Sequence, residues 1–246
     1  MKVQVALTTV DRPRSYVKQT LERLFSSDPS TDELEAIRVV VDGHSAGFLG
    51  EWVRDPRVEI ELLSARTAKM QAKADPIDRC AFTTYRALND HPGSQFDEED
   101  SLILLQDDLE FAPGWLERTL EVTLCIEADT GSDNFVLAMY APHPFEKRPY
   151  SVYTRQDFYG CQALYFTPRA LHAMAGALYE GNVQHRGKIV TGRVPDDLIF
   201  RNHFIAHREP YLLAMVPSVV QHPGRCPRSG SGFHQSPTFE RGVGSS

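Results

Sequence analysis

Cysteine is scarce in this chain, and its spacing excludes two kinds of small, cross-linked fold. The 246 residues contain four cysteines, and no two of them form a Cys-x-x-Cys pair. Zinc ribbons and disulfide-rich scaffolds need such pairs or a dense cysteine framework. We expect Cys80 and Cys125 to lie in the core, because they fall in helical apolar patterns, and Cys161 and Cys226 to be more exposed.

Long apolar runs and an excess of basic residues are also missing. No stretch approaches the roughly 20 apolar residues that a membrane span needs. The first residues do not resemble a signal peptide, so we expect a cytoplasmic protein with no membrane span. The chain has 26 Lys and Arg against 33 Asp and Glu, a formal net charge of −7. This balance disfavours nucleic acid as a partner, although a local basic strip stays open.

The apolar content, in contrast, is sufficient for a core of domain size. Hydrophobic residues make up 41% of the chain and aromatic residues 10%, which is typical of a globular protein. We predict a single domain over residues 1–224. A flexible tail is expected over 225–246, because Gly, Ser and Pro are frequent there.

Strand patterns and helix patterns alternate along the chain. Apolar or alternating runs predict strands at 3–9, 37–41, 58–62, 102–105, 135–140, 162–166 and 211–216. Stripes of apolar residues at helical spacing predict helices at 15–25, 76–91, 113–128, 168–178 and 195–205. This alternation predicts an α/β fold with a mostly parallel central sheet flanked by helices.

Two adjacent carboxylates follow the apolar run at 102–105. Gln106, Asp107 and Asp108 come directly after Leu-Ile-Leu-Leu. Ligand crevices of open α/β sheets lie outside the carboxyl ends of the strands, so these side chains are well placed for a metal ion. Adjacent aspartates are equally typical of turns and helix N-caps, and the motif alone does not decide between the two.

Two later sites also place polar, ionisable side chains at the end of a predicted helix or strand. Asp196 and Asp197 open the predicted helix at 195–205, and His222 closely follows the last predicted strand. The helix dipole favours carboxylates at a helix start, so capping explains the aspartates as well as chemistry does. A surface or packed histidine is an equally good interpretation of His222 alone.

Together these motifs resemble glycosyltransferases of the GT-A (Rossmann-like) fold. The shared features are the Asp-Asp pair after a strand, Phe-x-Pro-x-Trp-Leu at 111–116 and Pro-Ser-x-x-Gln-His at 217–222. The nearest pattern is the group of the N-acetylglucosaminyltransferase IV enzymes, to which the Gly-x-Gln-Ala segment at 160–171 is also similar. The similarity runs in order from residue 3 to about 224. Gln106 departs from it, because the family usually has Glu there and Gln brings no charge.

The resemblance implies a metal-dependent transfer of a sugar from a nucleotide-sugar donor, a UDP-sugar first of all, to an acceptor hydroxyl. A divalent cation stabilises the leaving diphosphate in such reactions. The resemblance implies Asp108 and His222 as its ligands, and a mixture of oxygen and nitrogen ligands favours Mn²⁺ over Mg²⁺. It also implies that Asp197, or its neighbour Asp196, is the base of an inverting transfer.

Donor binding is expected at the tips of the early strands. The residues that we expect around the nucleotide are Thr8, Thr9, Arg12, Asp42, Arg79, Gln106, Asp107 and Arg225. The arginines among them are equally well explained as solvated surface charges. In this interpretation residues 1–112 form the half that binds the nucleotide sugar, and 113–224 form the acceptor and catalytic half.

Two other functions stay open. A nucleotidyltransferase would use the same acids, but it predicts a glycine-rich phosphate loop after the first strand, which residues 8–13 lack. A non-catalytic nucleotide-sugar or carbohydrate-binding protein would need no base. The acceptor stays open as well, since the aromatic and arginine-containing loop at 148–159 suits a glycan, a peptide, a lipid head group or a modified nucleobase.

Overall fold

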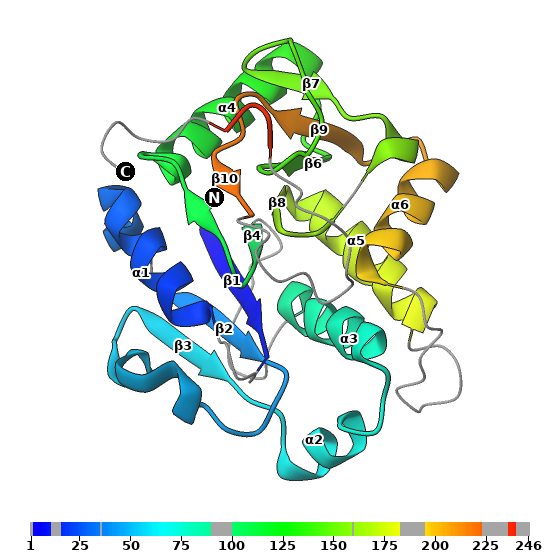
Figure 1. Cartoon of the computed structure of the whole chain (residues 1–246). Coiled ribbons are helices and arrows are strands. Elements are labelled where there is room, and N and C mark those ends of the chain that lie inside the picture. Colours follow the sequence, from blue (N-terminus) through cyan, green and yellow to red (C-terminus); the bar gives the residue numbers. More distant parts are fainter. Residues whose placement is uncertain are drawn as a thin grey trace.

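The centre of the protein is an eight-stranded sheet, seen in the computed structural model of the chain (Figure 1). The structure describes residues 2–10, 16–34, 36–89, 100–158, 160–182, 195–222 and 236–239. The strands of the sheet are β1 (Val3–Thr9), β2 (Ile37–Val41), β3 (Val58–Glu61), β4 (Ser101–Gln106), β6 (Phe135–Ala138), β7 (Tyr150–Val152), β8 (Ala163–Phe166) and β9 (Tyr211–Met215). Their order across the sheet is β3-β2-β1-β4-β8-β6-β9-β7.

Most of the neighbouring strands are parallel. β3, β2, β1 and β4 run in one direction, and β6 is parallel to β9. β8 is antiparallel to both β4 and β6, and β7 is antiparallel to β9. The predicted α/β fold with a mostly parallel sheet flanked by helices is therefore confirmed.

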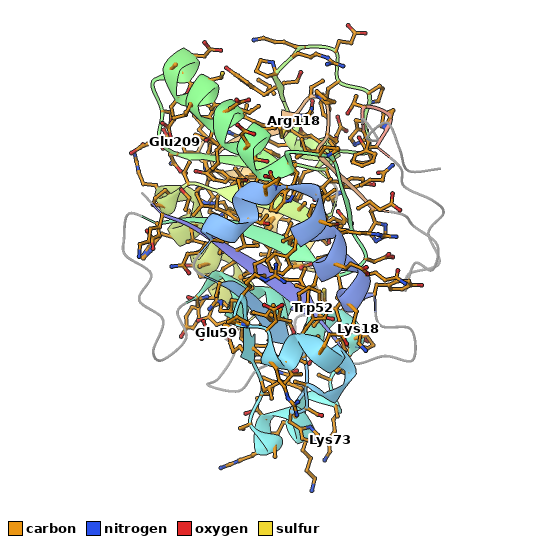
Figure 2. The ribbon with its side chains drawn as sticks, turned by 90° about the vertical axis from the view of Figure 1, so that its left-hand side faces the viewer. Lys18, Trp52, Glu59, Lys73, Arg118 and Glu209 are labelled. Atoms are coloured by element: carbon orange, nitrogen blue, oxygen red, sulfur yellow. The ribbon has the colours of Figure 1, made fainter. Side chains whose placement is uncertain are left out.

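Helices cover both faces of the sheet and bury two separate cores. On one face lie α1 (Val17–Ser27) and α4 (Trp115–Thr130), which Figure 2 shows toward the viewer with Lys18 and Arg118 labelled. The other face is covered by α3 (Pro76–Leu88), α5 (Pro168–Asn182) and α6 (Asp196–Ala206), to the right in Figure 1. Ile103 and Leu105 of β4 face the first core, while Leu102 and Leu104 face the second. Burial on both faces is why β4 is a continuous apolar run and not an alternating one.

Several short elements were not predicted from the sequence. They are the helix α2 (Ala65–Gln71), the 3-10 turns η1 (Pro29–Glu33), η2 (Gly47–Arg54) and η3 (Arg155–Asp157), and a separate antiparallel pair, β5 (Glu110–Phe111) with β10 (Val220–Gln221). The strand β7 was not predicted either, because it lies in the segment 148–159 that was expected to be a loop. The Ser64 hydroxyl caps α2 by accepting a hydrogen bond from the Thr67 N–H at 3.1 Å. Strands of two residues carry no periodicity of their own, so only tertiary pairing defines β5 and β10.

Helices α3 and α4 bury only part of the stripes that the apolar pattern predicts. Cys80 and Cys125, expected in the core, are exposed, whereas Cys161, expected to be exposed, is buried. On α3 the buried face contains Thr83 and Thr84, whose hydroxyls donate hydrogen bonds at 2.8 Å and 2.6 Å, so polar side chains with partners replace apolar ones. Cys226 lies outside the described residues.

The described part of the predicted tail packs against the domain. Of residues 225–246 the structure describes 236–239. Ser236 is buried, and its N–H donates to the Gln221 side chain at 2.8 Å while its hydroxyl donates to Ser218 at 2.8 Å. These four residues are therefore held against the segment that leads to His222. Among the described helices, none is long and apolar enough to cross a membrane.

Candidate functional site

The tips of β1 and β4 lie side by side and bring four predicted donor-site residues together. In the parallel register Thr8 is paired with Gln106, and the Asp107 N–H continues the ladder to the Thr8 carbonyl at 3.1 Å. The Thr9 hydroxyl donates to the Asp107 carboxylate at 2.8 Å, and the Thr8 hydroxyl donates to a backbone carbonyl of β4 at 3.3 Å. Asp107 is thus held in place by the neighbouring strand, which restricts its freedom to turn toward a ligand.

Asp108 occupies an unusual backbone conformation. Its φ is 74°, and within the described part of the chain it is the one non-glycine residue with a positive φ. Aspartate tolerates this left-handed region better than most residues, but it is still uncommon, and such outliers cluster at functional sites. Thr20 of α1, fully buried, stabilises the turn by accepting hydrogen bonds from the Asp108 N–H at 3.0 Å and the Leu109 N–H at 3.2 Å. The turn directs a buried carboxylate to the end of the central strand.

The short β5–β10 pair brings His222 to the same point. Gln221 is paired with Glu110 across this pair, so the residue after Gln221 arrives beside the Asp108 turn. His222 Nε2 lies 3.9 Å from Asp108 Oδ2, and the imidazole is 24% exposed. The structure therefore juxtaposes the two predicted metal ligands, which are more than a hundred residues apart in the sequence.

The distance between these two side chains is compatible with one shared cation. Ligand atoms that are each about 2.1 Å from an ion lie at most about 4.2 Å apart, so a separation of 3.9 Å is within the span of one ion. Neighbouring positions of an octahedral ion are about 3.0 Å apart, so the two side chains would move closer together to occupy them. No three His, Cys, Asp or Glu side chains converge on one point among the residues that the structure describes. The protein would thus supply two ligands, and phosphate oxygens and water would complete the shell of a cation such as Mn²⁺ or Mg²⁺. Without a cation, a protonated His222 would form an ion pair with Asp108.

A pocket of about 290 Å³ adjoins this edge of the sheet, at the tips of β2 and β3. Asp42, which follows β2, accepts a hydrogen bond from Arg79 of α3 at 2.8 Å, and its own N–H donates to the Thr9 carbonyl at 2.8 Å. The pocket is lined by Asp42, Gly43, His44, Ser45, Leu63, Ala65, Ala68, Lys69, Ala72 and Arg79. Asp42 and Arg79, both predicted at the nucleotide, thus meet at this pocket and are linked through Thr9 to Asp107.

The two aspartates at the start of α6 have different environments. Asp196 is buried, and its carboxylate accepts a 2.6 Å hydrogen bond from the Thr84 hydroxyl of α3. Burial raises the pKa of Asp196, the Thr84 hydrogen bond opposes this, and the charge of Asp197 adds to it. Asp197 is half-buried and caps the helix locally by accepting from the Leu198 N–H at 2.8 Å. Asp196 therefore joins α6 to α3, and Asp197 is the more accessible carboxylate.

Between the strand tips and α6 lies the segment from Gly160 to Gln162. The Gln106 N–H donates to the Gln162 carbonyl at 2.9 Å, which places this segment beside the end of β4. Burial raises the pKa of the Cys161 thiol well above its ordinary value, and the charges of Asp196 and Asp197 raise it further. Neither Gln162 nor Thr20 was predicted as part of the site. Thr20 had one signal in the sequence, because it is a polar residue within the apolar stripe of its helix.

Other predicted contributors lie elsewhere or outside the described residues. Arg12 and Arg225 belong to segments that the structure does not describe. In the loop considered for the acceptor, Tyr150 and Tyr153 are buried. The Arg155 guanidinium donates to the backbone carbonyls of Phe204, His207 and Arg208 at the end of α6. These three loop side chains support the fold and are not available to stack on a sugar.

Comparison with known proteins gives a likeness of shape only. No protein-family model matches the sequence, and no curated protein matches it. Among solved structures, a fragment of S. aureus TarS is similar with a TM-score of 0.49 at 12% identity, over 87% of this chain and 58% of the fragment. The same fragment in complex with UDP-GlcNAc gives 0.47 at 14% identity, over 87% and 56%. For 4-diphosphocytidyl-2C-methyl-D-erythritol synthase the values are 0.47 and 12%, over 87% and 88%. The chain thus spans a little over half of the TarS fragment, and at these identities no residue's role transfers from these proteins.

Proposed function

We propose that this protein is a metal-dependent glycosyltransferase that moves a sugar from a nucleotide-sugar donor, first of all a UDP-sugar, to an acceptor hydroxyl. The observation that supports this best is the juxtaposition of Asp108 and His222 at the tip of the central strand. Asp108 has an uncommon left-handed backbone conformation, and the β5–β10 pair places His222 beside it. A shared metal ion explains why both features occur at the same point.

The nucleoside part of the donor is assigned to the pocket at the tips of β2 and β3. Its volume of about 290 Å³ is near the lower end of the range for small-molecule sites, about 300–1,000 Å³, so it suits a base with its ribose better than a whole nucleotide sugar. The methyl groups of Ala65, Ala68 and Ala72 provide an apolar wall for a planar ring. Asp42 and Arg79 provide polar groups for its edge or for the ribose hydroxyls.

The diphosphate is assigned to the tips of β1 and β4, beside Asp107 and Asp108. A bound cation supplies the charge that stabilises the leaving diphosphate. Asp108 and His222 would hold this cation, and the hydrogen bond from Thr9 holds Asp107 beside it. On the other side, Asp197 is assigned as the base that takes the proton of the acceptor hydroxyl, which makes the transfer inverting. Asp196 positions the start of α6 through Thr84.

The resemblance to the N-acetylglucosaminyltransferase IV group adds that the sugar is a hexose or an N-acetylhexosamine. A nucleotidyltransferase and a non-catalytic nucleotide-sugar-binding protein are the competing functions. They differ in products, because a nucleotidyltransferase releases pyrophosphate from a nucleoside triphosphate and a binding protein releases nothing. A glycosyltransferase releases a nucleoside diphosphate from the donor sugar.

A panel of UDP-, GDP- and CMP-sugars, tested with Mn²⁺ or with EDTA, distinguishes these functions. We expect slow release of nucleoside diphosphate from at least one UDP-sugar when water replaces the acceptor, and loss of that release with EDTA. Pyrophosphate release from CTP or UTP would favour the nucleotidyltransferase. Absence of metal-dependent binding and turnover with every donor would refute the proposal.

A further inference from the structure

A buried amide oxygen that accepts no hydrogen bond from the described residues lies beside the end of β4. Gln162 directly precedes β8, and β8 is antiparallel to β4, so β8 begins where β4 ends. The Gln162 side-chain Oε1 is buried and accepts no hydrogen bond within the described structure. Buried polar atoms almost always have a hydrogen-bond partner, because leaving one unpaired destabilises the folded protein. Gln162 lies at the edge of the sheet where the proposed site is, so a bound ligand can supply the missing donor.

The backbone before Gln162 provides the space for this amide. Gly160 has a φ of 75°, a conformation that side chains rarely allow. A Cβ on residue 160 would lie 1.9 Å from Gln162 Oε1 and 2.5 Å from both of the other atoms of the amide group. The carboxamide therefore occupies the place where any other residue at 160 would put its side chain.

The position of Gln162 separates the two halves of the proposed site. On one side its carbonyl accepts from the N–H of Gln106, next to the carboxylates at the tip of β4. On the other side its neighbour Cys161 is close enough to α6 for Asp196 and Asp197 to affect the pKa of the thiol. If the diphosphate lies at the strand tip and the base at α6, the sugar that is transferred lies between them.

We propose that Gln162 is a specificity-determining residue whose Oε1 accepts a hydrogen bond from a hydroxyl of the transferred sugar. This inference rests on the proposed glycosyltransferase function and adds the contact that recognises the sugar. The unpaired oxygen gains its donor when the nucleotide sugar binds, and a nucleotide without a sugar leaves it unpaired. Sites built around such a bond discriminate strongly against ligands that lack the matching group.

Calorimetric titration with UDP and with UDP-sugars, in the presence of Mn²⁺, tests this contact. Gln162→Met keeps the shape of the side chain and removes the acceptor. We expect it to bind UDP within about twofold of the wild type and to bind the preferred UDP-sugar about tenfold more weakly, the loss expected for one such hydrogen bond. Gln162→Glu, which keeps an acceptor oxygen, should retain most of the affinity for the sugar. Gln4→Met makes the same change at the opposite end of the sheet and should alter neither affinity.

A second measurement compares donors that carry different sugars, with the wild type and with Gln162→Met. The wild type is titrated with UDP-glucose and with UDP-galactose, UDP-xylose and UDP-GlcNAc, each of which differs from UDP-glucose at a single ring position. We expect at least one substituent change to weaken binding about tenfold and Gln162→Met to abolish that preference. Equal affinities for the four donors, or an unchanged preference in a folded Gln162→Met protein, would overturn the role of Gln162 alone. If the wild type binds neither UDP nor any UDP-sugar with Mn²⁺, the proposed function fails together with this inference.

Discussion

At the scale of single residues, the Asp108 turn depends on one buried hydroxyl. Thr20 accepts hydrogen bonds from the N–H groups of residues 108 and 109, and it comes from α1, far away in the sequence. The hydroxyl thus holds the backbone in the left-handed conformation that orients the carboxylate. The place of Thr20 in the apolar stripe of its helix indicates that it is buried, but no periodicity reveals which N–H groups its hydroxyl accepts from.

Thr20→Val should therefore weaken both the fold and the site. Valine has the same shape but leaves two buried N–H groups unpaired, so we expect the free energy of unfolding in urea to fall by about 1–3 kcal/mol. We also expect a loss of Mn²⁺-dependent nucleotide binding. Thr119→Val removes another buried hydroxyl, which donates to the Trp115 carbonyl at 2.7 Å and lies 3.9 Å from Met215 Sδ of β9, and should leave nucleotide binding intact. Unchanged stability and binding in Thr20→Val would show that the turn does not need this hydroxyl.

The two aspartates of α6 should respond differently to replacement. Asp197→Asn should keep donor binding and lose transfer by at least about a hundredfold, because general base catalysis contributes about 10²–10⁴-fold. Asp133→Asn, at a surface carboxylate paired with Arg169 at 2.9 Å, is the matched control and should leave turnover unchanged. Turnover that survives in Asp197→Asn would move the base elsewhere and would leave the metal site unaffected.

The raised pKa of Asp196 should make the free energy of unfolding depend on pH. Burial raises its pKa in the folded state above the ordinary value of 3.8, so the folded state binds more protons than the unfolded state between the two pKa values. The free energy of unfolding therefore falls as the pH rises through that window, and the cost persists at neutral pH. Asp196→Asn lacks this charge, and Thr84 can rotate to satisfy the amide. We expect urea titrations from pH 3 to 7 to show the variant gaining stability relative to the wild type. A constant difference across this range would contradict the raised pKa.

At the scale of elements, the sequence predicted best those segments whose own pattern defines them. The strands at 3–9 and 37–41 were predicted with the bounds that the structure has. The helix α2, with the sequence Ala-Arg-Thr-Ala-Lys-Met-Gln, has no apolar stripe and was missed. The buried faces of α3 and α4 differ in part from the predicted ones, because hydrogen-bond partners on other elements decide which polar residues can be buried. No local pattern predicts the pairing of β5 with β10. The prediction that Asp108 and His222 share one site therefore rested only on a family resemblance.

One carboxylate connects two helices of the first face. Asp28 is buried after the end of α1, and it accepts hydrogen bonds from Ser30 of η1 and from the Leu116 and Glu117 N–H groups of α4. α4 has no side-chain cap of its own, so Asp28 caps it from a distance. Burial by itself raises the pKa of Asp28, but the hydrogen bonds from Ser30, Glu117 and Leu116 outweigh it and lower the pKa.

Asp28→Asn should thus lower the free energy of unfolding at neutral pH and leave it nearly unchanged in acid. We expect the free energy of unfolding to fall by about 1–3 kcal/mol at pH 7, because several cap bonds lose the ionised acceptor. Since the folded pKa lies below 3.8, the contribution of the charge is present above that value and is lost as the pH falls through the folded pKa. The two proteins should converge in urea titrations toward pH 2. Asp55→Asn, at a partly exposed carboxylate paired with Arg57, should have a much smaller effect. An equal loss in both variants would refute the capping role of Asp28.

At the scale of the whole molecule, the parallel sheet explains why distant residues meet. The carboxyl ends of β1, β2 and β4 open on one edge of the sheet, so Thr9, Asp42 and Asp107 are neighbours there. Antiparallel β8 adds Gln162 to this edge, and the β5–β10 pair adds His222. The edge could be predicted from the alternation of strands and helices. The pattern alone did not predict the residues that antiparallel strands bring to it, because strand direction is set by the long-range topology: His222 was predicted only from the family resemblance, and Gln162 was not predicted.

The most direct test of this account is the affinity for Mn²⁺ in the presence of UDP, measured from the electron paramagnetic resonance signal of free Mn²⁺. We compare the wild type with Asp108→Asn, in which asparagine tolerates the left-handed turn, and with His222→Gln. His172→Gln, at an exposed histidine of α5, is the control. We expect UDP to strengthen Mn²⁺ binding to the wild type and to the control. Each site variant should weaken Mn²⁺ binding at least about tenfold, because replacing even a residue that hydrogen-bonds to a metal ligand costs about 10–100-fold in metal affinity. Equal Mn²⁺ affinity in all four proteins would contradict the metal site at the tip of β4.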